Sequence, residues 1–288
     1  MSSQNAEIAV IGGSGLYEMD ALNNVEQVDV DTPFGSPSDR IVLGELGGVR
    51  VAFLPRHGRG HRFNPTHIPV RANIYALKSL GVERILSVSA VGSLKEELRP
   101  LDLVIPDQII DRTKTRISTF FGDGLVAHVG FADPFCPDLR RDSLDAADGL
   151  ATVHDGGTYV VIEGPQFSTR AESALYRSWD ADVIGMTALP EAKLAREAEI
   201  CYATLAFVTD YDVWRESEED VSVEMVVANL MKNVETARTI IRNIAARVSS
   251  ERECGCGTTL ETAIITGRDL IPHETRERLG LLVDRYLN

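Results

Sequence analysis

Two carboxylates stand directly after an apolar segment, where a ligand-binding strand would end. Residues 200–208 have the pattern of a buried strand, and Asp210 and Asp212 follow it. In an extended chain both side chains can point into the crevice at the carboxyl end of an α/β sheet. This acceptor pair suits a heterocycle with ring N–H and exocyclic NH₂ groups. Taken alone, the pair fits a solvated acidic loop better, so other segments must decide.

A second group of residues is typical of anion binding. A β-branched strand at 7–11 leads into Gly12-Gly13-Ser14-Gly15, whose backbone N–H groups and Ser14 hydroxyl can converge on an anion. The strand 49–54 ends near Arg56 and His57, a combination that fits a phosphate dianion. The glycine spacing matches neither a dinucleotide fingerprint nor a P-loop. Each signal alone also fits a tight turn or a basic surface loop.

Small and hydroxyl-bearing residues end two further predicted strands. Ser89 and Ala90 follow one, and Gly185 and Thr187 stand at the end of another, on either side of Met186. Small side chains at these ends would let a ligand approach the backbone closely. Phe167 follows a third strand and could stack on a flat ring, although core packing is the commoner role of such an aromatic residue.

The remaining pattern predicts the elements that position these residues. Strand-like and helical segments alternate, which is typical of an α/β domain. The predicted strands are residues 7–11, 40–46, 49–54, 85–88, 158–162, 183–187 and 200–208, and residues 101–110 form a further apolar stretch that is broken at Pro106. The predicted helices are residues 73–80, a helix ending at 178, 190–198, 221–248, and two short ones at 259–266 and 273–287. Residues 113–137, which contain His128, lack periodicity and are predicted to be a long functional loop.

Length and charge exclude several classes of protein. The 288 residues carry 43 acidic against 29 basic side chains, a formal charge of −14, which repels a nucleic-acid backbone. No apolar run approaches the roughly 20 residues of a membrane helix, and no signal segment follows Met1. We therefore expect a soluble, cytoplasmic protein without nucleic-acid or membrane partners. The acid-rich, lysine-poor composition suggests a salt-loving source, although an ordinary acidic cytosolic protein has a similar balance.

Six ordered segments together resemble the methylthioadenosine phosphorylase branch of the trimeric purine nucleoside phosphorylases. The resemblance extends from about residue 8 to residue 287 and suggests an archaeal member. The matching segments are Gly12-Gly13-Ser14-Gly15, Arg56-His57-Gly58, residues 89–94, residues 163–167, Gly185-Met186-Thr187 and residues 209–214.

This resemblance implies a fold, a reaction and an assembly. The fold is a single α/β domain over residues 1–288 with a mixed central sheet flanked by helices, in which residues 1–5 are frayed and the helices of 257–288 pack on the domain. The reaction is the reversible phosphorolysis of S-methyl-5'-thioadenosine to adenine and 5-methylthioribose 1-phosphate, in methionine and purine salvage. Inorganic phosphate is a co-substrate, with no cofactor and no metal. The assembly is a homotrimer or a dimer of trimers.

Two alternative functions stay open at this point. A purine nucleoside phosphorylase with broader specificity for adenosine, inosine or methylthioinosine is one. A non-catalytic nucleotide-binding protein is a more distant one.

The resemblance also implies residue roles. Asp210, if burial raises its pKa, would act as the general acid at purine N7, and Asp212 would accept a hydrogen bond from the 6-amino group. Gly185 stands where close relatives often have asparagine, so a contact by that side chain is absent. The implied phosphate ligands are Ser14, Arg56, His57, Ser89, Ala90 and Thr187; the base and ribose contacts are Phe167 and Met186; the 5' pocket is formed by Val223, Val226 and His128, the last from a neighbouring subunit.

The four cysteines are Cys136, Cys201, Cys254 and Cys256. None shows the paired spacing of a zinc site or a C-x-x-C motif. The family positions of Cys136 and Cys201 could lie close together, and Cys254 and Cys256 are another possible pair, although bridges between residues i and i+2 are strained. Free thiols are the expectation in a cytosolic protein.

Overall fold

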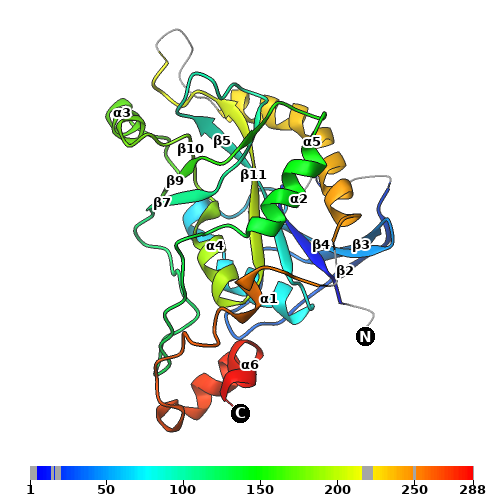
Figure 1. Cartoon of the computed structure of the whole chain (residues 1–288), viewed down its shortest axis with the longest axis vertical. Helices are drawn as coiled ribbons and strands as arrows, with labels where there is room; N and C mark the ends of the chain where they lie inside the picture. The colour runs from blue at the N-terminus through cyan, green and yellow to red at the C-terminus, as the bar shows by residue number, and fades with distance from the viewer. Residues whose placement is uncertain (1–4, 14–15, 17–20, 216–222, 249–250, 288) are drawn as a thin grey trace.

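The fold is organised around β5 (Arg84–Ser93), because three other strands pair with it. The computed structural model describes residues 5–13, 16, 21–215, 223–248 and 251–287. In this part of the chain eleven strands form one mixed sheet (Figure 1). β5 runs parallel to β1 (Ile8–Gly12) and β11 (Cys201–Asp210) and antiparallel to β10 (Val183–Gly185). The predicted α/β fold with a mixed central sheet flanked by helices is confirmed.

The other strands extend the sheet in two directions. On one side the order is β1, β4, β3, β2, and on the other β10, β9, β7, while β6 and β8 continue from β11. These strands are β2 (Asn23–Val28), β3 (Ile41–Leu46), β4 (Val49–Pro55), β6 (Leu103–Ile105), β7 (Gln108–Arg112), β8 (Val153–Asp155) and β9 (Thr158–Ile162). The predicted hairpin is confirmed as the antiparallel pair β3 and β4.

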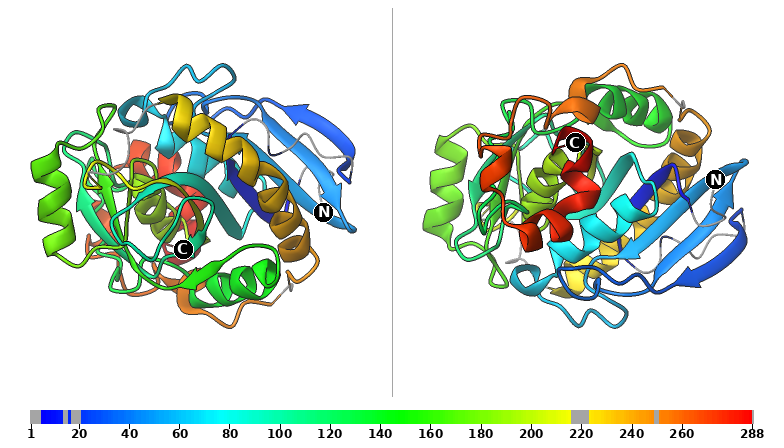
Figure 2. Two further views of the ribbon diagram at one scale, coloured as in Figure 1. Left: turned by 90° about the horizontal axis from the view of Figure 1, so that it is seen from above. Right: turned by 90° about the horizontal axis from the view of Figure 1, so that it is seen from below.

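Helices cover both faces of the sheet. Apolar side chains of α1 (Val70–Ser79), α4 (Ala188–Glu197) and α6 (His273–Leu287) belong to one buried cluster. Those of α2 (Pro137–Ala147) and α5 (Val223–Ala245) belong to a second cluster. Figure 2 shows the helices arranged around the strands. Burial of these apolar surfaces supplies the main driving force for folding. None of the helices in the described residues combines the length and apolar character that a membrane span requires.

The peripheral helix α3 (Arg170–Ser178) lies at one edge of the molecule (Figure 1). Its start is fixed by a capping box, in which the Thr169 hydroxyl accepts from the Glu172 backbone N–H and the Glu172 carboxylate accepts from the Thr169 backbone N–H. This helix follows the segment that carries Phe167.

The irregular segment 113–136 contacts the C-terminal segment. The backbone N–H of His128 donates to the carbonyl oxygen of Ala263 at 2.9 Å, and Ala127 forms an isolated β-bridge with Ile264. The predicted helix at 259–266 is therefore wrong: these residues form turns and this bridge. Their backbone groups pair with the long loop, so they are not available for a helical ladder.

Candidate active site

Asp210 lies at the carboxyl end of β11, beside Gly92 of β5. The pairing register of the two strands shifts between Val208 and Asp210, which marks a β-bulge. A Cβ atom added to Gly92 would lie 2.8 Å from Oδ1 of Asp210 and 3.1 Å from the side chain of Ile184. Glycine is therefore required for the Asp210 carboxylate to lie against the sheet.

Hydrogen bonds hold the Asp210 carboxylate in place. Oδ2 accepts from the Thr209 hydroxyl at 2.7 Å, and Oδ1 accepts from the backbone N–H of Asp212 at 2.9 Å. Asn229 of α5 donates its side-chain N–H to the Thr209 carbonyl oxygen at 2.7 Å. These bonds fix the turn after β11 and tie it to α5.

Asp212 has the features of a ligand-reading carboxylate. It is only 9% exposed, and its Oδ2 atom has no hydrogen-bond partner among the described residues. Burial raises the pKa of Asp212. The raised pKa expected at Asp210 stays a prediction, and the shift that burial causes belongs to Asp212. A buried acceptor without a partner is costly unless a bound molecule supplies the donor.

Arg56 is held in a buried ion pair that the sequence did not predict. Its guanidinium donates from Nε and from one terminal nitrogen to the carboxylate of Glu191 on α4, the second bond measuring 3.1 Å. Further bonds go to the Ser87 hydroxyl at 2.6 Å and the Val88 carbonyl oxygen at 3.1 Å. Glu191 also accepts from the Tyr202 hydroxyl at 2.9 Å. Although burial alone lowers it, Glu191 raises the pKa of Arg56, which stays charged.

The Arg56 guanidinium therefore already binds a protein carboxylate, that of Glu191. A guanidinium has five N–H donors. The bonds to Glu191, Ser87 and Val88 use four of them, and the fifth is on the terminal nitrogen that contacts Val88. Arg56 can offer a phosphate oxygen that single donor together with its charge. A bidentate contact between Arg56 and phosphate would require Glu191 to be displaced.

His57 is neutral near pH 7. Burial, together with the positive charge of Arg56, lowers the pKa of His57 to about 4. Its Nδ1 atom lies 2.8 Å from the Phe63 carbonyl oxygen, which a neutral ring satisfies by donating from Nδ1. The ring stacks on His61 with 4.1 Å between centroids. Nε2 is then an acceptor, suited to an O–H group such as that of a protonated phosphate.

Residues just before α4 and on β5 belong to the predicted phosphate site. The hydroxyl groups of Thr187 and Ser89 lie 3.0 Å apart. A Cβ atom at Gly185 would lie 2.3 Å from the Tyr159 hydroxyl oxygen, so Tyr159 occupies the space that an asparagine side chain would need there. Ala90 lies on β5 next to Ser89.

Arg116 fixes the neighbouring strand ends and was missed in the sequence. Its side chain is 3% exposed and reaches out of the irregular segment to the carbonyl oxygens of Met186, Leu189 at 2.7 Å and Ile162 at 3.2 Å. It also pairs with Glu163 at 3.3 Å. Although burial opposes it, hydrogen bonds from the Lys114 N–H and the Thr66 hydroxyl lower the pKa of Glu163 to about 2. No periodic pattern marks Arg116, so only the fold reveals this role.

The other predicted contacts are only partly described. Phe167 is 42% exposed, Val226 is half-buried and His128 is exposed on its own chain. Ser14 lies outside the described residues, as does the side chain of Val223. The structure thus brings Asp210 and Asp212 together at one strand end, and Arg56, Ser89 and Thr187 near α4. The roles assigned to these residues stay predictions.

Comparison with known proteins shows a full-length match. The sequence model described as the Phosphorylase superfamily matches residues 7–246. The S-methyl-5'-thioadenosine phosphorylase of Koribacter versatilis is 59% identical over 282 residues, covering 98% of this chain and 97% of that protein. The protein of the same name from Geobacter sulfurreducens is 60% identical over 282 residues, covering 97% and 99%. These bacterial relatives give the expected archaeal source no support.

Solved structures agree with the sequence comparison. The crystal structure of a methylthioadenosine phosphorylase from an antarctic soil metagenomic library superimposes with a TM-score of 0.93 at 56% identity, covering 97% of this chain and 99% of that one. The methylthioadenosine phosphorylase from Schistosoma mansoni in complex with adenine has a TM-score of 0.81 at 38% identity, covering 86% and 93%.

Proposed function

Because the chain belongs to the phosphorylase superfamily, we propose that it catalyses the reversible phosphorolysis of S-methyl-5'-thioadenosine. The products are adenine and 5-methylthioribose 1-phosphate, which makes the enzyme a pentosyltransferase. Full-length similarity to proteins of that activity supports the assignment. Within the structure, the observation that carries it is the buried Asp212 carboxylate beside Asp210 after β11, whose Oδ2 atom has no hydrogen-bond partner among the described residues.

The proposed reaction breaks the bond between C1' of the ribose and N9 of the purine. Positive charge develops on the sugar, and phosphate beneath the ring stabilises it while forming the new bond to C1'. The purine leaves more readily when N7 receives a proton. We assign that donor role to Asp210, and we assign Asp212 as the acceptor for the 6-amino group. The reaction needs no metal or cofactor, because phosphate itself carries the negative charge and hydrogen-bond donors of the protein stabilise that charge.

The proposed phosphate site lies where β4, β5 and α4 meet. Arg56 supplies charge, Ser89 and Thr187 supply hydroxyl donors and His57 a ring nitrogen, with Ser14 and Ala90 added from the resemblance. The position of Arg56 is supported by its backbone N–H, which donates to the Gly12 carbonyl oxygen at 3.0 Å and joins the ends of β4 and β1.

The rest of the substrate is proposed to lie between subunits. Phe167 and Met186 would contact the base and ribose, and Val223 and Val226 would form an apolar wall for the methylthio group. His128 is exposed on its own chain, so it is available to a neighbouring pocket. We therefore propose a homotrimer or a dimer of trimers in which residues 1–288 act as one nucleoside phosphorylase domain. The cytoplasmic location stays a prediction.

Release of free purine by the purified enzyme tests the assignment. With phosphate present, kcat/KM should fall in the order S-methyl-5'-thioadenosine, adenosine, inosine, because a carboxylate at Asp212 accepts from a 6-amino group and is repelled by a 6-oxo group. Asp212→Asn should narrow the gap between adenosine and inosine. Faster cleavage of inosine than of S-methyl-5'-thioadenosine would establish the broader phosphorylase instead. Binding without any phosphate-dependent release would leave a non-catalytic nucleoside-binding protein.

A further inference from the structure

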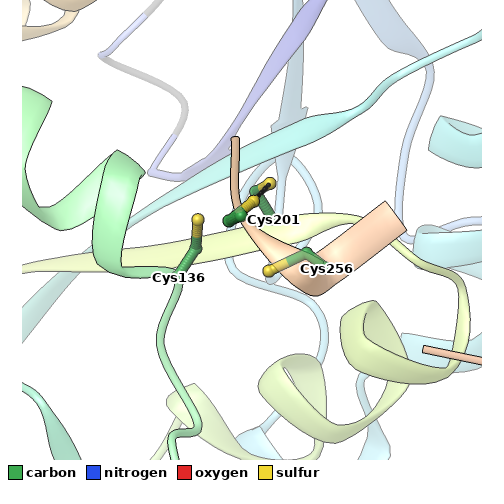
Figure 3. Close-up of side chains that lie close together, drawn as sticks. Cys136, Cys201 and Cys256 are labelled. Atoms are coloured by element: carbon green, nitrogen blue, oxygen red, sulfur yellow. Dashed lines mark hydrogen bonds between the residues drawn. The ribbon is translucent and has the colours of Figure 1, made fainter. Parts of the chain in front are cut away.

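Four cysteines that are far apart in the sequence meet at the start of β11. Cys136 precedes α2, Cys201 is the first residue of β11, and Cys256 belongs to the C-terminal segment (Figure 3). Cys254 lies two residues before Cys256. The four Sγ atoms all lie within 4.8 Å of one another, and the Sγ atoms of Cys201 and Cys254 are 3.4 Å apart. All four are free thiols. The linear spacing argued against a zinc site, but the fold brings the four sulfur atoms together from three separate segments.

We propose that Cys136, Cys201, Cys254 and Cys256 bind one zinc ion in a structural, four-thiolate site. Zinc in such sites is tetrahedral with Zn–S bonds of about 2.3 Å, which places the sulfur atoms about 3.8 Å apart. The observed separations bracket this value. Small side-chain rotations are therefore enough to close the tetrahedron.

The surroundings favour thiolate ligands. Cys136 is the N-cap residue of α2, so it lies at the helix end that carries a partial positive charge. Binding replaces the four thiol protons with Zn²⁺ and releases them to solvent, with no change of oxidation state. Arg84 and Arg252 line the adjoining cavity and offset part of the resulting negative charge.

A path for the ion leads from solvent to the cluster. Cys136, Cys201 and Cys254 contribute to the wall of a cavity of ≈ 210 Å³ beside α2. Asp142 and Glu251 stand on the same wall and could capture a hydrated cation first. Cys256 is only 3% exposed and closes the far side of the cluster.

The location assigns the site to stability and not to catalysis. Cys201 begins β11 and Asp210 ends it, and ten strand residues span about 30 Å. The ion would join the α/β core to the C-terminal segment, which carries α6 and pairs with the loop of His128. Metal binding would therefore hold that loop in position indirectly.

Metal analysis of the full-length enzyme, purified under reducing conditions with zinc supplied, tests the proposal. We expect one zinc per chain, an X-ray absorption spectrum with four sulfur ligands at about 2.3 Å, and thiols that react with a disulfide reagent only after the metal is removed. Cobalt should replace zinc and give the intense absorption of a tetrahedral thiolate complex. Substoichiometric zinc with reactive thiols would overturn the proposal. The proposal would also be overturned if the intact mass of the reduced, zinc-supplied protein showed that one or two disulfides had formed.

Variants separate metal binding from folding. Cys254 is half-buried, so Cys254→Ser should fold, lose at least tenfold in zinc affinity and show no rise of Tm with zinc. Thr258→Ala, an exposed change on the same short helix, should bind zinc as the unaltered chain does. Below the unfolding temperature, kcat should be the same with and without zinc. Equal zinc content in Cys254→Ser and Thr258→Ala would contradict the assignment.

Discussion

Replacement of Glu191 by glutamine should strongly destabilise the fold. Arg56 and Glu191 are 3% and 1% exposed, so the guanidinium depends on this carboxylate for charge compensation. Glutamine keeps the size of the side chain and removes its charge. Leaving one partner of a buried ion pair uncompensated costs about 3–5 kcal/mol. That loss is a large part of the roughly 5–15 kcal/mol by which folded proteins are stable.

An exposed ion pair in the same sheet region provides the control. Arg40 and Asp29 are 57% and 74% exposed and lie 3.0 Å apart. Because solvent screens such pairs, Asp29→Asn should cost less than about 1 kcal/mol. Urea unfolding followed by tryptophan fluorescence measures both variants. A loss for Glu191→Gln no larger than that for Asp29→Asn would refute the compensating role of the buried pair.

Phosphate extends the same experiment to the proposed function. A bound dianion would supply Arg56 with the negative charge that Glu191→Gln removes. Phosphate should therefore raise the free energy of unfolding of this variant more than that of the unaltered enzyme. If phosphate raised the free energy of unfolding equally in both proteins, Arg56 would not belong to the phosphate site. Its structural role would be unaffected by that result.

Three further outcomes are expected. Between pH about 4 and 6.5, His57 binds a proton in the unfolded chain but stays neutral in the folded protein, so the free energy of unfolding should rise with pH by up to about 1.4 kcal/mol per unit. His57→Gln should flatten this pH dependence in urea unfolding, and an unchanged slope would contradict the argument. Gly92→Ala should displace Asp210 and lower kcat at least tenfold, while Gly122→Ala, where nothing lies within 4 Å, should not; equal activities would disprove the close-approach argument. Light scattering should show a trimer or hexamer, and an active monomer would exclude a shared pocket.

Much of the sheet could be predicted because its strands are apolar runs bounded by turns. The hairpin of β3 and β4 and the buried strand β11 follow the predicted bounds within about two residues. β5 extends to Ser93, well beyond the predicted 85–88, because pairing with β11 and β10 holds its small residues extended. Helix α2 was not predicted, since few of its residues are apolar and only four are buried.

The candidate site was predictable where ligand-type residues follow a strand. Asp210 and Asp212 carry this signal in the sequence itself. Glu191 was not predicted, because its partner Arg56 is 135 positions away and a buried charge has no local pattern. Arg116 was missed for a related reason: it lies in a segment without periodicity, and its bonds reach strand ends that only the fold brings near.

The serines of β5 show how a buried strand can mark a site. Ser87 and Ser89 are two residues apart and so share one face of the strand. They are 0% and 4% exposed, where an unpaired hydroxyl would be costly. Ser87 contacts Arg56 and Glu191, and Ser89 contacts Thr187 just before α4. Both serines thus face the α4 side of the sheet, which is where phosphate is proposed to bind. Polar residues in a strand that solvent does not reach therefore indicate polar partners, which here lie at the proposed phosphate site.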